Sequence, residues 1–439
     1  MFLKIEKQVK EIVKNLDPLE TYIVGGYVRD KLMRRKPKDI DIVSKLSIQE
    51  ISKKIFLKPY IVNDRFKTAR FYFKESFIDY NSIEDFNKDL KRRDFTINSI
   101  ACDLTGKIYD PLNGINDIEN KIIRLSSRTS LTDDPVRILR AFRLKHQLGF
   151  NYNRQLIPLI KKASMLLLNS PKERIYIELK EIFSYLERGA AFSELHDAGL
   201  LIKIFPDLFP TLKFIHIKHK SWFLIKHLLN TATALDIILK ERMPKELRDY
   251  ANNNMFVLYM SSLFHDISKP DVFTIEKNKQ KFYNHEILAS HKIVKMLKRD
   301  IKIPNSEAEK ISLLIKMHMR PHFLIKEDIP TDRSLFRLQR DSKNEICGLI
   351  LLCMADVLAS EGRIEREYFK LFKRMNSIKV KIEKKQIRFL NGNEIMDYFK
   401  LKPGKIIGEM LDSASSWAIE NNVSDKKKII DYLKEKFSL

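Results

Sequence analysis

The feature that most constrains the fold is the stretch at residues 22–43, YIVGGYVRDKLMRRKPKDIDIV, which joins a Gly-Gly turn to two aspartates spaced i, i+2. Side chains alternate along a β-strand, so a strand here places Asp39 and Asp41 on one face and turns Ile40 and Ile42 into the interior. Two neighbouring carboxylates suit a hard divalent cation. A lone D-x-D triplet is more often simply solvated, so the metal site depends on what surrounds it.

The Gly-Gly pair follows a strand expected at Thr21–Val24. Gly25 and Gly26 let the backbone turn tightly and approach a ligand. The helix expected from Tyr27 would point its first amides at a phosphate, with Arg29 one turn in. Such a turn is a weak signal by itself, but beside the aspartate pair it predicts a triphosphate cradle that faces a metal site.

Further β-like segments at 59–62, 67–73 and 76–81, with a helical 47–56, predict a small mixed sheet with helices on one face. The fold class of this head is therefore α+β. Asp79 could supply a third carboxylate, although an exposed strand residue is the commoner role for such a side chain.

The segment at residues 91–98, KRRDFTIN, sets Arg93 and two further cations beside apolar side chains. Fixed positive charge at this point would stabilise leaving phosphates. A basic helix terminus is the structural alternative, and both interpretations stay open from the residues alone.

The segment at residues 132–143, TDDPVRILRAFR, also has two interpretations. Asp134 before a proline is a good helix N-cap, which would explain it structurally. Asp134 is also followed at three-residue intervals by arginines that share one helix face, Arg137, Arg140 and Arg143. A carboxylate accepts from an exocyclic amine and a guanidinium donates to a ring nitrogen, a pattern that only cytosine and adenine match. An Asp134/Arg137 pair could thus choose CTP and ATP without a nucleic-acid template.

Four motifs in order carry a resemblance to a known family: GGYVRD with DID, RRDFTINSIA, DPLNGINDI and DDPVRILRAFRLKHQLGF. Over roughly the first third of the chain they resemble the head motifs of class II tRNA nucleotidyltransferases, which include bacterial CCA-adding enzymes and poly(A) polymerases. The resemblance implies a polymerase-β-like head in which Asp39 and Asp41 are catalytic and hold two Mg²⁺ ions. The nucleotide-binding residues that it implies are Gly25, Gly26, Arg29, Arg93, Asp134, Arg137, Arg140 and Arg143.

The same resemblance implies in-line attack by the tRNA 3′ hydroxyl on the α-phosphorus of CTP or ATP, with release of pyrophosphate and no covalent intermediate. Two departures from the family pattern matter. Asp133 stands where the family has a glutamate, and the connection from Asp41 to Arg92 is short. Members that add the full CCA usually carry a flexible loop there, and its absence resembles enzymes restricted to CC addition. The terminal A step is therefore in doubt.

Length and charge point to several domains and a polyanionic partner. The chain has 439 residues, with 81 Lys and Arg against 57 Asp and Glu and a formal net charge of +24. This length exceeds what one core normally supports, and the charge favours nucleic acid, although a lysine-rich proteome would give the same balance.

No apolar run spans a bilayer, no signal-peptide pattern is present and the three cysteines lack C-x-x-C spacing, so we expect a soluble, cytoplasmic protein without a membrane partner.

We predict four parts along the chain: a nucleotidyltransferase head at 1–145, a helical neck at 146–205, an HD-like helical domain at 206–385 and a helical, tRNA-contacting module at 386–439. In the neck, SPKE has the form of a capping box with Ser170 as the cap. The ERIYIELKEIF segment after it resembles the family's neck motif, and we expect it to pack against the base-reading helix without a catalytic role.

Most of the histidines lie in the central region. A single histidine there is more often a surface or core residue than a ligand, but imidazoles and carboxylates from several helices could converge on a divalent metal softer than magnesium. KHLLNT, FHDISKP, NHEILASH, MHMRPH and ADVLAS resemble, in order, the motifs of HD phosphohydrolases. The ligands that this resemblance implies are His227, His265, Asp266 and Asp356, with His285 and His318 at a second metal position. An active phosphohydrolase and a helical spacer that helps to grip tRNA both remain open.

The leading interpretation is a template-independent tRNA 3′-end nucleotidyltransferase that adds C, A or both. A poly(A) polymerase shares the head, but the HD-like domain and the missing loop argue against it. Two further hypotheses are a metal-dependent phosphohydrolase with an RNA-binding head and a non-catalytic RNA-binding protein. The intact Asp39/Asp41 pair argues against both of them.

Overall fold

The computed structural model describes residues 2–63, 67–74, 76–185, 188–216, 222–326, 330–385, 390–421, 423 and 425–438. The chain divides into two compact units, an N-terminal unit of Met1–Leu186 with Ser193–Ile204 and a C-terminal unit of Glu187–Phe192 with Phe205–Leu439. Among the described residues, every helix is too short or too polar to span a lipid bilayer.

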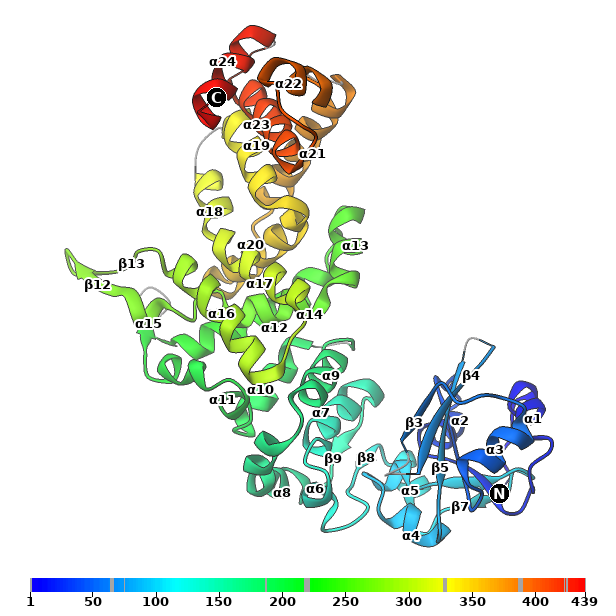
Figure 1. Ribbon diagram of the computed structural model, residues 1–439. Coiled ribbons are helices and arrows are strands. Elements are labelled where there is room, and N and C mark those ends of the chain that lie inside the picture. Colours follow the sequence, from blue (N-terminus) through cyan, green and yellow to red (C-terminus); the bar gives the residue numbers. More distant parts are fainter. Residues whose placement is uncertain are drawn as a thin grey trace. The chain divides into compact units, whose positions relative to one another are not determined.

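The N-terminal unit is built on a mixed sheet. In the described part of the chain this sheet has seven strands in the order β3-β4-β5-β2-β1-β6-β7. Figure 1 labels β3, β4, β5 and β7. β2 and β5 run parallel, and the other neighbouring strands run antiparallel. The strands are β1 (Thr21–Val24), β2 (Ile40–Ser44), β3 (Ile61–Asn63), β4 (Thr68–Phe73), β5 (Ser76–Ser82), β6 (Ala101–Asp103) and β7 (Ile108–Tyr109). The mixed sheet confirms the α+β class predicted for the head.

One face of the sheet packs against α1 (Lys7–Val13), α2 (Gly26–Leu32) and α3 (Ile48–Ile55). Alternate strand residues supply this core: Ile42, Phe71 and Ile78 are at most 2% exposed. We call the opposite face, which carries Asp41, the open face.

The prediction of helices on one face only is wrong at one end of the sheet. There α4 (Phe86–Lys91) buries Leu90 against Val24 and Val43, whose side chains alternate with those of the main core. Helix α4 thus covers the open face at Val24 and Val43 and leaves the part that carries Asp41 uncovered.

The rest of the N-terminal unit is mostly helical, and α7 and α9 pack side by side. The elements are η2 (Thr96–Asn98), α5 (Gly114–Glu119), the parallel pair β8 (Ile122–Ile123) and β9 (Asn151–Tyr152), α6 (Ser130–Asp133), α7 (Arg137–Leu148), α8 (Leu156–Ala163), η3 (Ser164–Asn169), α9 (Lys172–Ile182), α10 (Arg188–Asp197), which continues into the other unit, and α11 (Leu201–Ile204). The capping box predicted at Ser170 is wrong. The N-cap of α9 is Pro171, without a side-chain cap.

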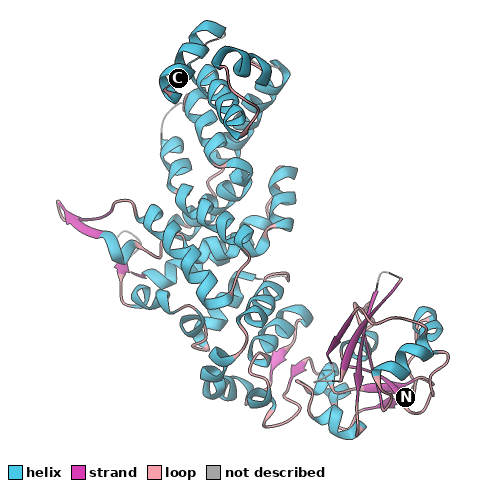
Figure 2. Cartoon of the chain, in the orientation of Figure 1, coloured by secondary structure: helices cyan, strands magenta, loops and turns pink. Residues whose placement is uncertain are grey.

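The C-terminal unit is mostly helical, as Figure 2 shows, and its described residues include two small antiparallel strand pairs. Helices α12, α14 and α20 contact one another, and α14 is buried from Phe256 to Phe264, as expected of a helix that is apolar on all sides. The helical elements are η4 (Pro206–Leu212), α12 (Leu224–Lys240), α13 (Lys245–Asn253), α14 (Met255–Phe264), α15 (Lys269–Val272), α16 (His285–Ile301), α17 (Asn305–Met317), α18 (Met319–Lys326), α19 (Asp332–Asp341), η5 (Lys343–Glu345), α20 (Ile346–Glu361) and α21 (Glu367–Lys385). The strand pairs are β10 (Ile215–His216) with β11 (Trp222–Phe223), and β12 (Phe273–Glu276) with β13 (Lys279–Phe282).

The last helices of this unit have a core of their own. They are α22 (Gly392–Phe399), α23 (Lys405–Asn421) and α24 (Lys426–Phe437), which bury Met410, Ile429 and Leu433 completely. The division into four domains stays a prediction, and its last boundary, at residue 386, lies outside the described residues.

Candidate functional site

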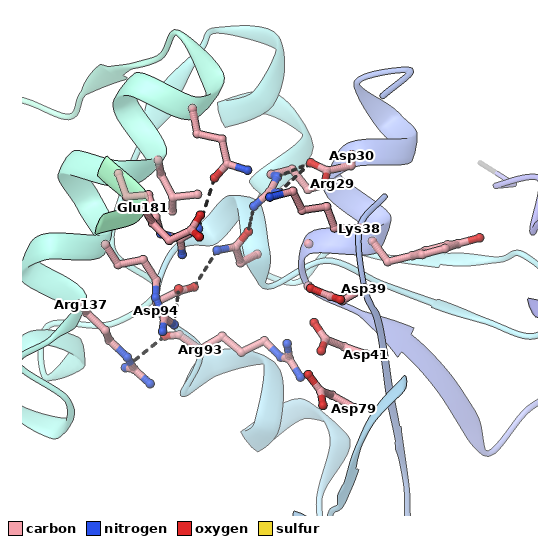
Figure 3. Close-up of a pocket in the computed structure, with 18 of the residues that line it drawn as sticks. Arg29, Asp30, Lys38, Asp39, Asp41, Asp79, Arg93, Asp94, Arg137 and Glu181 are labelled. Carbon is pink, nitrogen blue, oxygen red and sulfur yellow. Dashed lines mark hydrogen bonds and ion pairs between the residues drawn. The ribbon is translucent and has the colours of Figure 1, made fainter. Parts of the chain in front are cut away.

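The open face of the N-terminal sheet gathers carboxylates at the start of β2 (Figure 3). Asp39 immediately precedes β2 and Asp41 is its second residue. Asp41 pairs in register with Asp79 on β5, and side chains paired across a sheet point to the same face. The structure therefore brings Asp39 and Asp41 together as predicted. Asp79, for which the sequence favoured an ordinary exposed role, lies beside them.

Gly25 makes room for this cluster. Its φ is +70°, a conformation that favours glycine. A Cβ at this position would lie 3.0 Å from Arg93 Nη1 and 3.0 Å from Asp41 Oδ2, so a side chain would crowd both groups. At Gly26, the first residue of α2, a Cβ would meet only Arg29 Nη2 at 3.6 Å, an ordinary contact.

Neighbouring cations offset the negative charge of these carboxylates only in part. Desolvation by burial raises the pKa of Asp41 to about 6, and Asp79 and Asp39 add to this increase while Arg93 opposes it. Oxygen ligands crowded in this way are what a hard divalent cation prefers. The donor set of Asp39 and Asp41 thus fits Mg²⁺.

Asp79 already has a cationic partner. Arg70 on β4 donates from Nε to Asp79 Oδ1 at 2.6 Å and from Nη2 to Asp79 Oδ2 at 2.7 Å. This bidentate geometry offsets the charge of Asp79. Asp39 and Asp41 are consequently the better cation ligands of the three carboxylates.

The cations predicted to contact triphosphate line the same cleft, whose volume is about 1090 Å³. Arg93 is held by buried Asp89, which accepts from Nε at 3.1 Å and from Nη2 at 3.0 Å. Its guanidinium points toward Asp41 in Figure 3. Arg29 is 5% exposed and donates from Nη1 to Asn98 Oδ1 at 2.7 Å. Both cations are fixed in position before any ligand arrives.

Asp134 is not the N-cap that the sequence allowed. The N-cap of α7 is Val136, and Asp134 is extended, with φ −147° and ψ 94°. Its carboxylate instead accepts two bonds from Arg174 of α9, Nη1–Oδ1 at 3.0 Å and Nη2–Oδ2 at 2.7 Å. The Arg137 guanidinium comes no closer to the Asp134 carboxylate than 3.9 Å, and its Nη2 donates to the Arg92 carbonyl at 2.9 Å. The two predicted base-reading groups therefore lie near each other, but each has another partner.

The other arginines of α7 meet a buried glutamate. Glu178 of α9 accepts from Arg140 Nε at 3.1 Å and from Arg143 Nε at 2.8 Å. Arg174 and Glu178 belong to the neck segment that the sequence analysis assigned to packing, so both were missed. Their signal was an arginine and a glutamate four residues apart, which share a helix face.

Asp94 joins α7 to the sheet side of the cleft. Arg140 Nη1 donates to Asp94 Oδ2 at 3.1 Å, and Asn98 Nδ2 donates to Asp94 Oδ1 at 2.9 Å. Burial raises the pKa of Asp94, but Arg140, Asn98 and the Phe95 amide outweigh it and hold the pKa below its ordinary value. Asn98 also binds Arg29, so one chain of contacts runs from the Gly-Gly turn to the neck.

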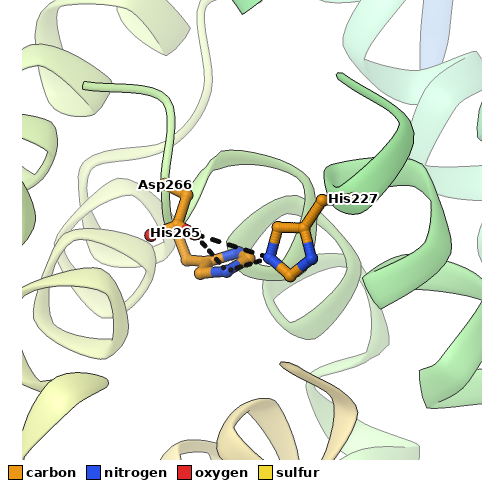
Figure 4. A group of neighbouring side chains, drawn as sticks. All are labelled: His227, His265 and Asp266. Atoms are coloured by element: carbon orange, nitrogen blue, oxygen red, sulfur yellow. Dashed lines mark hydrogen bonds and ion pairs between the residues drawn. The ribbon is translucent and has the colours of Figure 1, made fainter. Parts of the chain in front are cut away.

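The predicted ligands of the C-terminal unit meet in one buried cluster, part of which is drawn in Figure 4. The possible ligand atoms of His227, His265 and Asp266 all lie within 4.8 Å of one another, and so do those of Asp266, His285 and His318. Asp356 Oδ1 lies 3.2 Å from His227 Nε2. Five helices and the loops beside them supply these side chains.

The histidines of this cluster present the same ring nitrogen to its centre. The Nδ1 atoms of His265, His285 and His318 lie 3.0, 2.8 and 2.7 Å from the carbonyl oxygens of Ser262, Phe282 and Ile315. A carbonyl only accepts, so Nδ1 carries a proton and Nε2 faces the carboxylates. Metal-ligating histidines are commonly oriented in this way.

A cation fits the cluster for a further reason. Asp266 Oδ1 and His285 Nε2 are buried 3.1 Å apart, and neither atom has a hydrogen-bond partner among the described residues. Burial lowers the pKa of His265, but Asp266 and Asp356 raise it overall to about 10. Burial lowers that of His318 to about 4, which keeps its imidazole neutral. A divalent metal would satisfy the facing acceptors.

His322 was not predicted as part of the cluster. Its Nε2 lies 3.1 Å from Asp356 Oδ2, and its Nδ1 contacts the Tyr368 hydroxyl. The signal was present in MHMRPH, where His322 follows His318 by four residues and so shares its helix face.

Family models match three successive parts of the chain. The Poly A polymerase head domain matches residues 21–83 and 63–124, the probable RNA and SrmB-binding site of polymerase A matches 149–212, and the HD domain matches 224–360. The fold and the carboxylate site thus define a nucleotidyltransferase head followed by an RNA-binding segment and an HD domain with a His/Asp cluster, and both regions indicate the use of divalent metal.

Similar individual proteins identify the family more narrowly than the domain matches do. A CC-adding tRNA nucleotidyltransferase of Halalkalibacterium halodurans is 37% identical over 41% of this chain and 49% of its own length, so the chain spans about half of that relative. A CCA-adding enzyme of Lactobacillus helveticus is 30% identical over 57% of this chain and 70% of its own length. The structure of a Thermotoga maritima CCA-adding enzyme complexed with tRNA superposes with a TM-score of 0.62 at 23% identity, covers 100% of both chains and shows the same fold. The chain belongs to the class II CCA-adding tRNA nucleotidyltransferase family.

Proposed function

We propose that this protein extends the 3′ end of tRNA with nucleotides from CTP or ATP and releases pyrophosphate. The observation that supports this most is the Asp39–Asp41 pair, crowded on the open face of the sheet and faced by the fixed guanidinium of Arg93. The family and the tRNA in the Thermotoga complex support tRNA as the acceptor. A poly(A) polymerase shares this head, so the acceptor must be tested.

Each part of the cleft has a role in this reaction. Asp39 and Asp41 would hold Mg²⁺, which supplies Lewis-acid stabilisation of the phosphoryl oxygens and of the leaving pyrophosphate. Arg93 and Arg29 would bind the triphosphate and hold its α-phosphorus in line with the tRNA 3′ hydroxyl. The hydroxyl oxygen gives up its proton to water and forms the new P–O bond as the bond between the α-phosphorus and pyrophosphate breaks.

Base choice would fall to Asp134 and Arg137. Arg174 occupies the Asp134 carboxylate, so an incoming exocyclic amine would share or replace one of its two hydrogen bonds. Glu178 would keep Arg140 and Arg143 anchored beside the base-reading pair. Uracil and guanine would present a donor to Arg137 and be rejected.

The short connection after β5 favours CC as the product. β5 ends at Ser82 and α4 begins at Phe86, which leaves no space for a flexible loop between them. We therefore infer that the protein adds the two cytidines, and that addition of A is weak or requires another enzyme.

The test uses tRNA transcripts that end before CCA, after C and after CC, each with CTP and ATP supplied separately and together. We expect magnesium-dependent incorporation of C on the first two transcripts and little A on the third. No incorporation on any transcript would contradict the transferase assignment. Efficient addition of A to the third would contradict the CC product, and long A tails on unrelated RNA would favour a poly(A) polymerase.

A second activity is supported by the histidine cluster of the C-terminal unit. Its facing acceptors suit a transition metal, which His265, Asp266 and His285 would help to hold and which would supply Lewis-acid chemistry for hydrolysis of a phosphoester. The test is phosphate release from a 2′,3′-cyclic nucleotide with added Ni²⁺ or Mn²⁺. Release that is absent, or that persists in His265→Ala, would leave the cluster as a structural feature.

A further inference from the structure

The open face of the sheet carries exposed aromatic rings beyond the carboxylates. Tyr72 on β4 is 54% exposed and Phe77 on β5 is 36% exposed. The two residues are paired across the strands, and their ring centroids lie 5.3 Å apart. Tyr60, 72% exposed, adds a third ring 6.5 Å from that of Phe77. We call Tyr60, Tyr72 and Phe77 the aromatic face.

The strand register places the aromatic face on the same side of the sheet as the candidate active site. Phe77 precedes Asp79 by two residues on β5, and side chains two apart on a strand share a face. Asp79 pairs with Asp41. Ile78, which lies between Phe77 and Asp79 on β5, and its partner Phe71 on β4 are buried in the core on the other side of the sheet. The aromatic rings are therefore next to the carboxylates, along the same strands.

Arg70 connects the two groups. Its guanidinium carbon lies 5.3 Å from the centroid of the Phe77 ring, and its nitrogens hold Asp79 in the bidentate pair described above. The Arg70 side chain is 43% exposed. From the aromatic face to the candidate active site, the order is thus the Phe77 ring, the Arg70 guanidinium and the Asp79 carboxylate.

These rings are large apolar side chains left in solvent beside a polar cleft. Packing alone explains a buried ring, but Tyr72 and Tyr60 bury less than half of their surface against the described residues. Exposed aromatic side chains on a sheet beside a positive charge are the arrangement that proteins use to stack unpaired nucleic-acid bases.

We propose that the aromatic face binds the unpaired 3′-terminal bases of the RNA substrate by stacking, with Arg70 close to the backbone phosphate. This rests on the proposed transferase function, because the 3′ hydroxyl must reach Asp41. Every base has a π-face, so stacking grips the end of the RNA without reading its sequence, as an enzyme that lengthens this end requires.

The experiment compares two RNA hairpins with the same stem, one blunt and one with a single-stranded 3′ overhang, without divalent metal or nucleotide. We expect Tyr72→Ala and Phe77→Ala each to weaken binding of the overhang RNA roughly ten-fold, the order of magnitude of one base–aromatic stack. Binding of the blunt RNA should not change. Phe56→Ala is the matched control, since Phe56 is 80% exposed and follows α3 on the covered side of the sheet.

Conservative variants separate stacking from folding. Tyr72→Phe should bind the overhang RNA as wild type does, whereas Tyr72→Leu, which keeps apolar bulk but no ring, should bind as Tyr72→Ala does. In turnover, Tyr72→Ala should raise the KM for RNA and leave the KM for CTP unchanged.

Several results would overturn the proposal. Equal loss on blunt and overhang RNA, a loss in Phe56→Ala as large as in Tyr72→Ala, or no loss at all would each exclude stacking at this face. A wild-type dimer that Tyr72→Ala dissociates would show a contact between copies instead. A wild type that binds overhang RNA through these rings yet incorporates no nucleotide would defeat the proposed function and support the aromatic face.

Discussion

The carboxylate site of the N-terminal unit and the histidine cluster of the C-terminal unit differ in exposure and in ligand chemistry. The first lies on an open face, with oxygen ligands and arginines placed around a large cleft. The second is buried, with imidazole nitrogens turned inward by backbone carbonyls. Oxygen ligands on an open surface suit Mg²⁺ that arrives with a nucleotide, whereas a buried nitrogen-rich cluster suits a resident transition metal. One chain thus holds two candidate metal sites that should respond independently.

The largest expected effect is on transfer. Asp41→Ala should lower the rate of CTP incorporation by at least about 100-fold, because it removes a ligand of the cation that stabilises the transition state. Binding of tRNA should stay within the wild-type range. Asp249→Ala, which removes an exposed carboxylate from α13, is the control. Transfer that survives in Asp41→Ala would move the active site away from β2.

The next prediction concerns the amount of metal bound at the histidine cluster of the C-terminal unit. Asp266→Ala should lose the metal bound at the histidine cluster, measured by elemental analysis after loading with Ni²⁺ or Mn²⁺, because Asp266 belongs to both ligand groups. CTP incorporation should not change. His291→Ala removes an exposed histidine from α16, the helix that begins at His285, and should keep the metal. A joint loss of metal and transfer would show that the two sites are coupled.

A variant in the neck tests whether the contact between Arg174 and Asp134 affects the choice of base. Arg174→Ala should lower kcat/KM for CTP roughly ten-fold and narrow the preference for CTP over UTP, because Asp134 loses its bidentate partner. Lys180→Ala, on the same helix and bonded to Tyr176, should behave as wild type. An unchanged preference would limit Arg174 to a structural contact.

The smallest effect is on acid stability. Arg140 and Asn98 hold the pKa of Asp94 below its ordinary value, so the charged form stabilises the fold at pH values above the ordinary pKa, and this contribution disappears as pH falls through the lowered one. Asp94→Asn should therefore cost about 1 kcal/mol of unfolding free energy near pH 7, and the difference should shrink below about pH 4. Urea titrations at several pH values measure it. A difference that is constant with pH would mean that the charge of Asp94 does not matter.

Local patterns were enough to predict much of the head. The period-two alternation around Asp39 and Asp41 identified β2, and the Gly-Gly pair identified the turn at Gly25. In the C-terminal unit it was the resemblance to HD phosphohydrolases, and not a local pattern, that named the side chains which meet in the histidine cluster. The strand and the turn could be predicted because the residues that determine them are close in sequence.

The failures involve partners that are distant in the chain. Asp134 looked like an N-cap because the proline after it is a local signal, but Arg174, forty residues away, takes its carboxylate. Asp79 looked isolated because its neighbour Asp41 lies across a parallel strand pair. No local rule gives that register, since it depends on the whole crossover between the strands.

The link after β5 also bears on how the proposed addition of nucleotides would stop. Residues 83–85 would span only about 10 Å when fully extended, and Ile83 is buried in the core. A link this short leaves no free chain that could change its contacts with the growing 3′ end between one addition and the next. The RNA itself would then set the number of nucleotides added. Addition would stop once the growing 3′ end fills the distance between the RNA stem and the carboxylates, so the length of the end, and not its sequence, would decide.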